Sequence, residues 1–399
     1  MLPMSEITFI FVRINYFIKP LITMKTNTKR LLALDVLRGI TIAGMILVNN
    51  PGSWQYVYAP LRHAKWNGLT PTDLVFPFFM FIMGISTYIS LKKFDFKFTK
   101  ESGIKIVRRT VAIFALGLAL SWIGLIFRAW NALSGEELSV FEKLWQSLWT
   151  FGNLRIMGVL GRLGICYGIV SLIACTLKHR YIPSIISVML GVYLVILYAG
   201  NGFAYDHTNV LSIVDRAVLG LNHMYNDNGI EPEGILSTIP AIAHVLIGFW
   251  CGKLIMNLEN IHEKIERLFL IGTMLTLAGF LFSYACPINK KIWSPSFVLV
   301  TCGMASLMQA LLLWFIDVKG KKKWSKPLEV FGANPLFIYV LAGILATVFA
   351  STIQGYVYKE MLQPVFGDYF ASFIYALLFV SIHWAVGYSL YKKKIYIKI

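Results

Sequence analysis

Charged residues are scarce in this sequence: only 14% of its 399 positions are Asp, Glu, Lys or Arg, whereas 57% are hydrophobic. That composition excludes an ordinary soluble protein, which would expose too much apolar surface. Long uncharged runs recur, and each is long enough to cross the ~30 Å hydrocarbon core of a bilayer as a helix. The runs do not alternate every second residue, as barrel strands do. The sequence therefore predicts an all-α, polytopic integral membrane protein with a helical-bundle fold.

Several familiar site patterns are missing as well. The five cysteines form no CxxC pair and the histidines have no metal-ligand spacing, so we expect neither a disulfide framework nor a metal site. No Walker loop, nucleophile elbow or dinucleotide fingerprint occurs. The net charge of +17 comes from short Lys and Arg clusters between apolar runs. Such clusters are typical of cytoplasmic loops, and we expect no nucleic-acid partner.

The apolar runs predict about ten membrane spans. They cover residues 33–51, 71–91, 104–128, 155–177, 181–199, 235–256, 266–285, 295–316, 328–350 and 369–391. Most basic residues lie on the cytoplasmic side if the chain before the first span is cytoplasmic, and the reverse orientation would invert this excess. The loops 51–70, 129–154 and 200–234 are then expected on the outer face.

Residues 1–24 form a separate segment. It is apolar, but Arg13 and Pro20 interrupt it, and it resembles neither a good span nor a signal peptide. We expect an N-terminal extension without a catalytic role, either a start assigned too early or an interfacial helix. A single transmembrane domain is expected over residues 25–399.

Ionisable residues within spans are costly in lipid and therefore mark candidate functional sites. Asp35 and Arg38 are expected on one face of the first span, where either an internal ion pair or an anion site at the cytoplasmic mouth would explain them. Asn49 lies ~16 Å further along the same helix, at its outer end. Arg155 and Arg162 are expected on one face of the fourth span, as part of a packing seam or as a positive lining for phosphate or carboxylate.

His63 is the best catalytic candidate. It lies in the 51–70 loop just before the second span, among polar residues, and imidazole can take a proton near neutral pH. Such a base suits the activation of an amine or a hydroxyl group, and Asp73 could orient the ring. Aromatic residues crowd the same loop, with Trp66 beside Asn67. They fit either an interfacial aromatic belt or a platform for a sugar.

Longer stretches of the chain carry a family resemblance. These are "LLALDVLRGITIAGMILVNNPGSW", "LRHAKWNGLTPTDLVFPFFMFIMGIS", "LRIMGVLGRLGICYG", "GLNHMYNDNGIEPEGILSTIPAI", "PINKKIWSPSFVLVTCG" and "FGANPLFIYV". In this order they resemble the transmembrane acetyltransferases typified by heparan-α-glucosaminide N-acetyltransferase. Members of that family use cytoplasmic acetyl-CoA to acetylate the amine of a terminal glucosamine on the far side of the membrane.

The resemblance implies roles for individual residues. His63 would be the catalytic histidine, and Asn49 would belong to the active site near the reacting thioester. We expect acetyl-CoA to contact Arg38, Asn49 and Arg162, and the acceptor to contact Trp66, Asn67, Asp73, His223 and Glu233. Asn49 would donate a hydrogen bond to the developing oxyanion while His63 removes the amine proton. An acetyl-histidine intermediate is an open alternative.

The sequence departs from the family pattern in places that leave the acceptor open. Glu231 stands where an Asp is expected, Gly161 stands where Gln is common, and the lumenal domain of lysosomal members does not precede the first span. We therefore expect a bacterial cytoplasmic membrane. The expected partners are acetyl-CoA, an amino-sugar or other glycan acceptor and the bilayer, with a homodimer left open. Acetylation of another cell-envelope glycan, or transport of a small anionic or sugar substrate, are the alternative functions.

Overall fold

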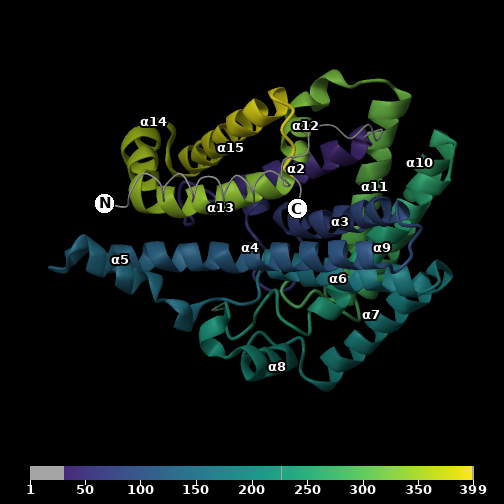
Figure 1. Cartoon of the computed structure of the whole chain (residues 1–399), viewed down its shortest axis with the longest axis horizontal. Coiled ribbons are helices and arrows are strands. Elements are labelled where there is room, and N and C mark those ends of the chain that lie inside the picture. The colour runs from purple at the N-terminus through teal and green to yellow at the C-terminus, as the bar shows by residue number, and fades with distance from the viewer. Residues whose placement is uncertain (1–30, 226, 398–399) are drawn as a thin grey trace.

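The computed structural model describes residues 31–225 and 227–397, so the predicted N-terminal extension lies outside the described residues. Its regular elements within these ranges are α-helices joined by short 3₁₀ and π turns, which confirms the all-α prediction. In Figure 1, α4 (Lys100–Ala132) crosses the molecule between α13 (Pro335–Thr352) and α6 (Val159–Thr176), and it contacts both.

Nine stretches of the described chain have the length and hydropathy of single membrane spans, and a bent pair of helices supplies a tenth. The other spanning helices are α2 (Leu32–Asn49), α3 (Val75–Lys92), α7 (Ile182–Ala199), α9 (Thr238–Asn257), α10 (Ile261–Phe282), α11 (Pro295–Leu313) and α15 (Asp368–Lys392). Shorter helices are α5 (Val140–Leu148), α8 (Val210–Leu219), α12 (Lys326–Ala333) and α14 (Gln363–Phe366). The expected number of spans is therefore confirmed.

The bent pair corrects the prediction of one continuous helix over residues 328–350. The helices α12 and α13 meet at an angle of 72°. Pro335 has no N–H group to donate, and its ring disfavours a helical conformation at the preceding residue. Asn334 accordingly leaves the helix, with φ −131° and ψ 55°. Its side chain instead donates to the Ile395 carbonyl at 2.9 Å and accepts from the Ile397 N–H at 2.7 Å.

The fourth span also differs from its prediction. It begins at Val159 and not at residue 155, and Gly158 precedes it in an extended conformation. Arg155 therefore lies before the helix. The prediction that Arg155 and Arg162 share one helical face is wrong. The preceding span is longer than expected: α4 has 33 residues, which corresponds to roughly 50 Å of helix. It therefore extends beyond the ~30 Å apolar core of a bilayer.

Glycines let neighbouring helices approach each other closely. A Cβ atom on Gly84 of α3 would lie 2.2 Å from the Val245 carbonyl oxygen of α9, and one on Gly248 would lie 2.2 Å from the Phe81 carbonyl oxygen. Helices in lipid associate largely through such close packing, because burial between them gains little over burial in lipid tails. The α3–α9 pair therefore packs closely along the middle of α3.

Three segments gather at one end of the bundle: residues 51–74, 200–237 without residue 226, and 286–294, which we call the loop end. The Gly68 N–H donates to the Ile288 carbonyl at 2.8 Å, and Trp66 Nε1 donates to the Phe203 carbonyl at 2.8 Å. These bonds bring together loops that are far apart in the chain. The loop end carries the residues of the candidate site.

Candidate active site

His63 and Asp73 form the centre of the site. The Nδ1 atom of His63 lies 2.6 Å from Oδ1 of Asp73. The Asp73 side chain is 1% exposed, whereas that of His63 is 43% exposed. An ionised carboxylate only accepts hydrogen bonds, so the neutral imidazole carries its proton on Nδ1 and has its lone pair on Nε2. The half-exposed ring therefore presents a nitrogen that can act as a base or a nucleophile.

A local capping motif holds the Asp73 carboxylate in place. In "TPTD", Thr70 caps the turn Pro71–Leu74 that leads into α3, and Asp73 returns the bond in a capping box. Oδ2 of Asp73 accepts from the Thr70 N–H at 3.1 Å, the Thr70 hydroxyl at 2.9 Å and the Ala64 N–H at 3.1 Å. One carboxylate oxygen thus closes the turn while the other binds the imidazole. The contact between Asp73 and His63 that the sequence suggested is present.

Lys290 is a third member of this centre that sequence reasoning missed. Its Nζ atom lies 3.0 Å from Nδ1 and 3.4 Å from Nε2 of His63, and 3.6 Å from Oδ1 of Asp73. Burial lowers the pKa of Lys290, although the carboxylates of Asp73 and Glu233 oppose that effect. The "NKK" in a stretch otherwise short of charge was the signal available in the sequence.

A cluster of arginine and glutamate lies next to this centre. Nε of Arg155 donates to Glu231 at 3.0 Å, and its Nη2 binds the carboxylates of both Glu231 and Glu233. Burial alone would raise the pKa of Glu233, but Arg155, Arg162 and Lys290 together lower it. Glu233 therefore connects the His63 centre electrostatically to Arg155. Glu233 is one of the residues predicted to bind the acceptor, but its carboxylate is already paired with Arg155 of the same chain.

Arg162 is enclosed within the protein. It has 0% relative exposure, binds the Ser237 hydroxyl and donates to the Gly234 carbonyl at 3.2 Å. Its guanidinium also lies 5.1 Å from the ring centre of Trp293. These contacts tie α6 to the turn that begins α9. A role in binding acetyl-CoA stays a prediction.

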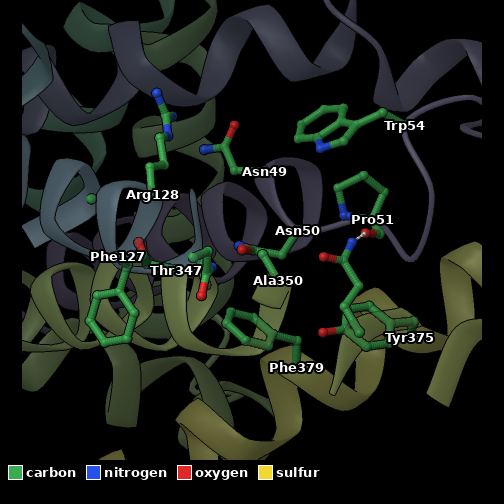
Figure 2. Close-up of a pocket in the computed structure, with 14 residues that line it drawn as sticks. Asn49, Asn50, Pro51, Trp54, Phe127, Arg128, Thr347, Ala350, Tyr375 and Phe379 are labelled. Atoms are coloured by element: carbon green, nitrogen blue, oxygen red, sulfur yellow. Dashed lines mark hydrogen bonds between the residues drawn. The ribbon is translucent and has the colours of Figure 1, made fainter. Parts of the chain in front are cut away.

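Two adjoining cavities lie at the C-terminal ends of α2 and α4, next to α13. Their volumes are about 660 and 400 Å³, which lies in the usual range for small-molecule sites. Asn49, Asn50, Arg128 and Thr347 line both of them. Figure 2 shows the residues that line the smaller one, among them Arg128 of α4 and Asn49 of α2. The larger one reaches Arg155, so its wall continues into the cluster beside His63.

Comparisons with known proteins show which family the chain resembles. The family model described as heparan-alpha-glucosaminide N-acetyltransferase, catalytic, matches residues 30–285. The chain belongs to this family. The mouse (Mus musculus) heparan-alpha-glucosaminide N-acetyltransferase is 27% identical over 94% of this chain and 62% of the relative. The human (Homo sapiens) protein of the same name is 28% identical, over 93% of this chain and 60% of the relative. The chain thus spans about three-fifths of the length of these curated relatives.

The family match covers most of the site, but not all of it. His63, Asp73, Asn49 and Arg155 lie within the matched region, whereas Lys290 follows it. Asn49 lines both cavities, and its place near the reacting thioester stays a prediction. His63 is not among the residues that line these two cavities, and no hydrogen bond joins it to Asn49 within the described residues. Their joint role in catalysis stays a prediction.

Arg38 lies toward the opposite end of α2. It forms an ion pair with Asp35 at 2.7 Å and donates to the Ser86 hydroxyl at 3.0 Å and the Gly332 carbonyl at 3.3 Å. The internal ion pair, one of the two explanations for this motif, is therefore present. Binding of an anion by Arg38 stays a prediction.

The remaining predicted acceptor residues join the loops to one another. Trp66 stacks on Tyr205, with ring centres 4.6 Å apart. Asn67 accepts from Asn289 at 3.1 Å, and Nδ1 of His223 donates to the Leu154 carbonyl at 2.7 Å. These contacts give each residue a place in the loop end. Contact with an acceptor stays a prediction for all of them.

Proposed function

We propose that this protein transfers the acetyl group of acetyl-CoA to the amine of a terminal glucosamine-type sugar at the loop end. The two curated relatives are named N-acetyltransferases of heparan-α-glucosaminide, and this chain belongs to their family. One observation carries the proposal: the buried Asp73 carboxylate lies 2.6 Å from Nδ1 of the half-exposed His63, which in the neutral ring leaves the lone pair on Nε2. Nitrogen in that state can accept the proton that an attacking amine must lose.

The reaction follows from this geometry. The sugar nitrogen attacks the thioester carbonyl while Nε2 of His63 takes the amine proton, a C–N bond forms and the C–S bond breaks. The same proton then passes to the departing thiolate of CoA. Asp73 keeps the imidazole in the required tautomer and balances its charge when it is protonated. Asn49, whose side-chain amide forms no hydrogen bond with another described residue, donates to the developing oxyanion.

A covalent route uses the same atoms. Nε2 of His63 attacks the thioester first, CoA leaves, and the acetyl-imidazole is then attacked by the amine. Trapping of labelled acetyl on the protein in the absence of acceptor distinguishes this route from direct transfer.

We further propose that the loop end faces away from the cytoplasm and that acetyl-CoA enters from the other side. The basic clusters near Lys92, Lys178 and Lys321 lie at the opposite ends of the helices, and such clusters favour the cytoplasmic side. The two cavities border α2 only between Met45 and Asn50. These cavities could form the outer part of a path along α2 for the arm of CoA that carries the acetyl group.

The decisive experiment measures transfer of labelled acetyl from acetyl-CoA to a glucosamine-terminated disaccharide by the purified protein in lipid nanodiscs. We expect His63→Ala to lower the rate by about 10²–10⁴-fold without loss of CoA binding. His207→Ala is the matched control, because His207 is exposed in another segment of the loop end. Near-normal turnover by the His63 variant excludes the mechanism. In proteoliposomes, uptake of label without product identifies a transporter, and label on a hydroxyl group of an N-blocked acceptor identifies O-acetylation.

A further inference from the structure

The end of the bundle opposite the loop end carries a concentrated basic surface. The sequence "KGKKKWSK" directly follows the membrane span that ends at Val318, and "KKK" lies at the end of α15. Every lysine in these two stretches is exposed. We call this set the lysine corner: Lys319, the lysines of 321–323, Lys326 and the lysines of 392–394.

Two contacts of Glu329 place the two stretches side by side. Its carboxylate accepts from the Ser325 hydroxyl at 2.7 Å and from the Tyr391 hydroxyl at 3.2 Å. Ser325 lies within the first stretch, and Tyr391 directly precedes the second. The helix α12 accordingly contacts α15 (Figure 1). Lysines that are far apart in the chain therefore form one surface.

Local backbone contacts make the first stretch an ordered turn. Gly320 has φ 65°, a left-handed conformation that favours glycine, and it turns the chain where the span ends. The Lys321 N–H donates to the Phe315 carbonyl at 3.1 Å, and the Ser325 N–H donates to the Lys322 carbonyl at 3.3 Å. These bonds fix the backbone of the turn, while the side chains of its lysines stay exposed.

The lysine corner holds more positive charge than its surroundings balance. Residues 314–330 and 385–399 contain the whole corner and only two acidic residues, Asp317 and Glu329. Within the described part of the chain, no salt bridge joins a lysine of the corner to a carboxylate. Ammonium groups gathered in this way repel one another, so an anionic partner would stabilise the surface.

Aromatic side chains beside the lysine corner are typical of the level of lipid headgroups. Trp324, which is 44% exposed, lies within the first stretch. Trp384 stacks on Tyr388 with ring centres 5.0 Å apart, and its Nε1 donates to the Pro327 carbonyl at 3.2 Å. Tryptophan and tyrosine are enriched where the hydrocarbon core of a bilayer meets water. Headgroups at that level are within reach of lysine, whose apolar stem lets the charged end extend to the interface.

We propose that the lysine corner binds the phosphate headgroups of anionic phospholipids in the adjacent leaflet. Lysine clusters of this size directly after a membrane span attract anionic lipids by their charge. A topology signal requires only charge within each loop, whereas here Glu329 joins two separate stretches beside tryptophan. The surface includes α12, which packs on α2: a Cβ on Gly39 would lie 1.9 Å from the Leu328 carbonyl oxygen. The inference does not depend on acetyl transfer.

Lipid titration of the purified full-length protein tests the lysine corner. The protein in a neutral detergent is titrated with phosphatidylglycerol or phosphatidylcholine, and affinity is measured by microscale thermophoresis. We expect phosphatidylglycerol to bind at least about tenfold more tightly, and this preference to shrink in about 0.5 M salt, which screens charge. Lys321→Gln, Lys322→Gln and Lys323→Gln combined should lower the affinity for phosphatidylglycerol by about 10- to 100-fold. The same three positions changed to Arg should keep it.

The matched control removes three exposed lysines outside the corner: Lys97→Gln, Lys100→Gln and Lys178→Gln combined. It should bind phosphatidylglycerol as the wild type does. Both triple variants change only exposed side chains, and their melting temperatures should equal that of the wild type. Equal losses of affinity in the two triple variants, or a wild type without a preference for the anionic lipid, would overturn the proposal. Weaker binding of CoA, with unchanged binding of phosphatidylglycerol, in the corner variant would also overturn it and assign the surface to the nucleotide phosphates.

Discussion

Replacing Asp73 by Asn separates its two tasks, closing the turn and holding the histidine. Oδ2 accepts from the N–H groups of Thr70 and Ala64, both at 3.1 Å, and an asparagine can satisfy these donors only with its oxygen. Its NH₂ group then occupies the position of Oδ1, 2.6 Å from Nδ1 of His63. That NH₂ donates to Nδ1, so the ring proton moves to Nε2. The nitrogen that should accept the amine proton is thereby blocked.

The size of the effect follows from these contacts. General-base catalysis contributes about 10²–10⁴-fold to a rate, and Asp73→Asn should remove most of it by imposing the wrong tautomer. The KM of acetyl-CoA should change little, because Asp73 is 1% exposed. The turn keeps its backbone hydrogen bonds, so stability should fall by only about 1.5–3 kcal/mol, the usual contribution of a charge-assisted hydrogen bond.

The assay is a single-turnover measurement of acetyl transfer in nanodiscs, combined with thermal unfolding of the same sample. Asp206→Asn is the matched control: Asp206 is an exposed loop-end aspartate that accepts from the Thr208 N–H at 2.8 Å and the Thr208 hydroxyl at 2.6 Å. The control should transfer acetyl at the wild-type rate. A folded Asp73→Asn protein with the wild-type rate would refute the assignment of the tautomer and of the base.

Two further predictions concern stability. Burial raises the pKa of Asp215 from 3.8 to about 6, so between these values the folded protein holds a proton that the unfolded chain has lost. Stability therefore falls as pH rises through this window, and Asp215→Asn should flatten the melting temperature against pH; parallel curves for both proteins would contradict this. Gly84→Ala places a methyl group 2.2 Å from the Val245 carbonyl and should cost at least about 1–3 kcal/mol. In calorimetry its melting temperature should drop relative to Gly191→Ala, which meets nothing within 4 Å, and equal values would show that α3 and α9 can separate freely.

Features encoded by neighbouring residues could be predicted from the sequence. The apolar runs predicted the number of spans, and Asp73, ten residues from His63, was correctly placed beside it. That contact can be inferred from the sequence because "TPTD" forms a capping box just before a hydrophobic run. The start of α6 and the bend at Asn334 were missed. Pro335 was visible in the sequence, but its effect on an apolar run that is otherwise long enough to span was not taken into account.

The site shows where local information stops. Lys290 reaches His63 across 227 positions of the chain, and Arg155 reaches Glu231 and Glu233 across 76 and 78 positions. No periodicity or motif joins such residues. Arg38 and Arg162 show the converse, since their charges were visible in the sequence but their partners within the protein were not.

The sequence by itself determined that this is a helical membrane protein and that a carboxylate lies close to His63 in the chain, because hydropathy and helix capping act over one span or one turn. Only the tertiary structure decided which charges meet and which remain without partners. Those contacts depend on how the helices pack, through glycine crossings such as that of Gly84 with α9. Packing left Arg128 exposed at the edge of a cavity while it enclosed Arg162, a difference that two arginines in apolar runs do not reveal.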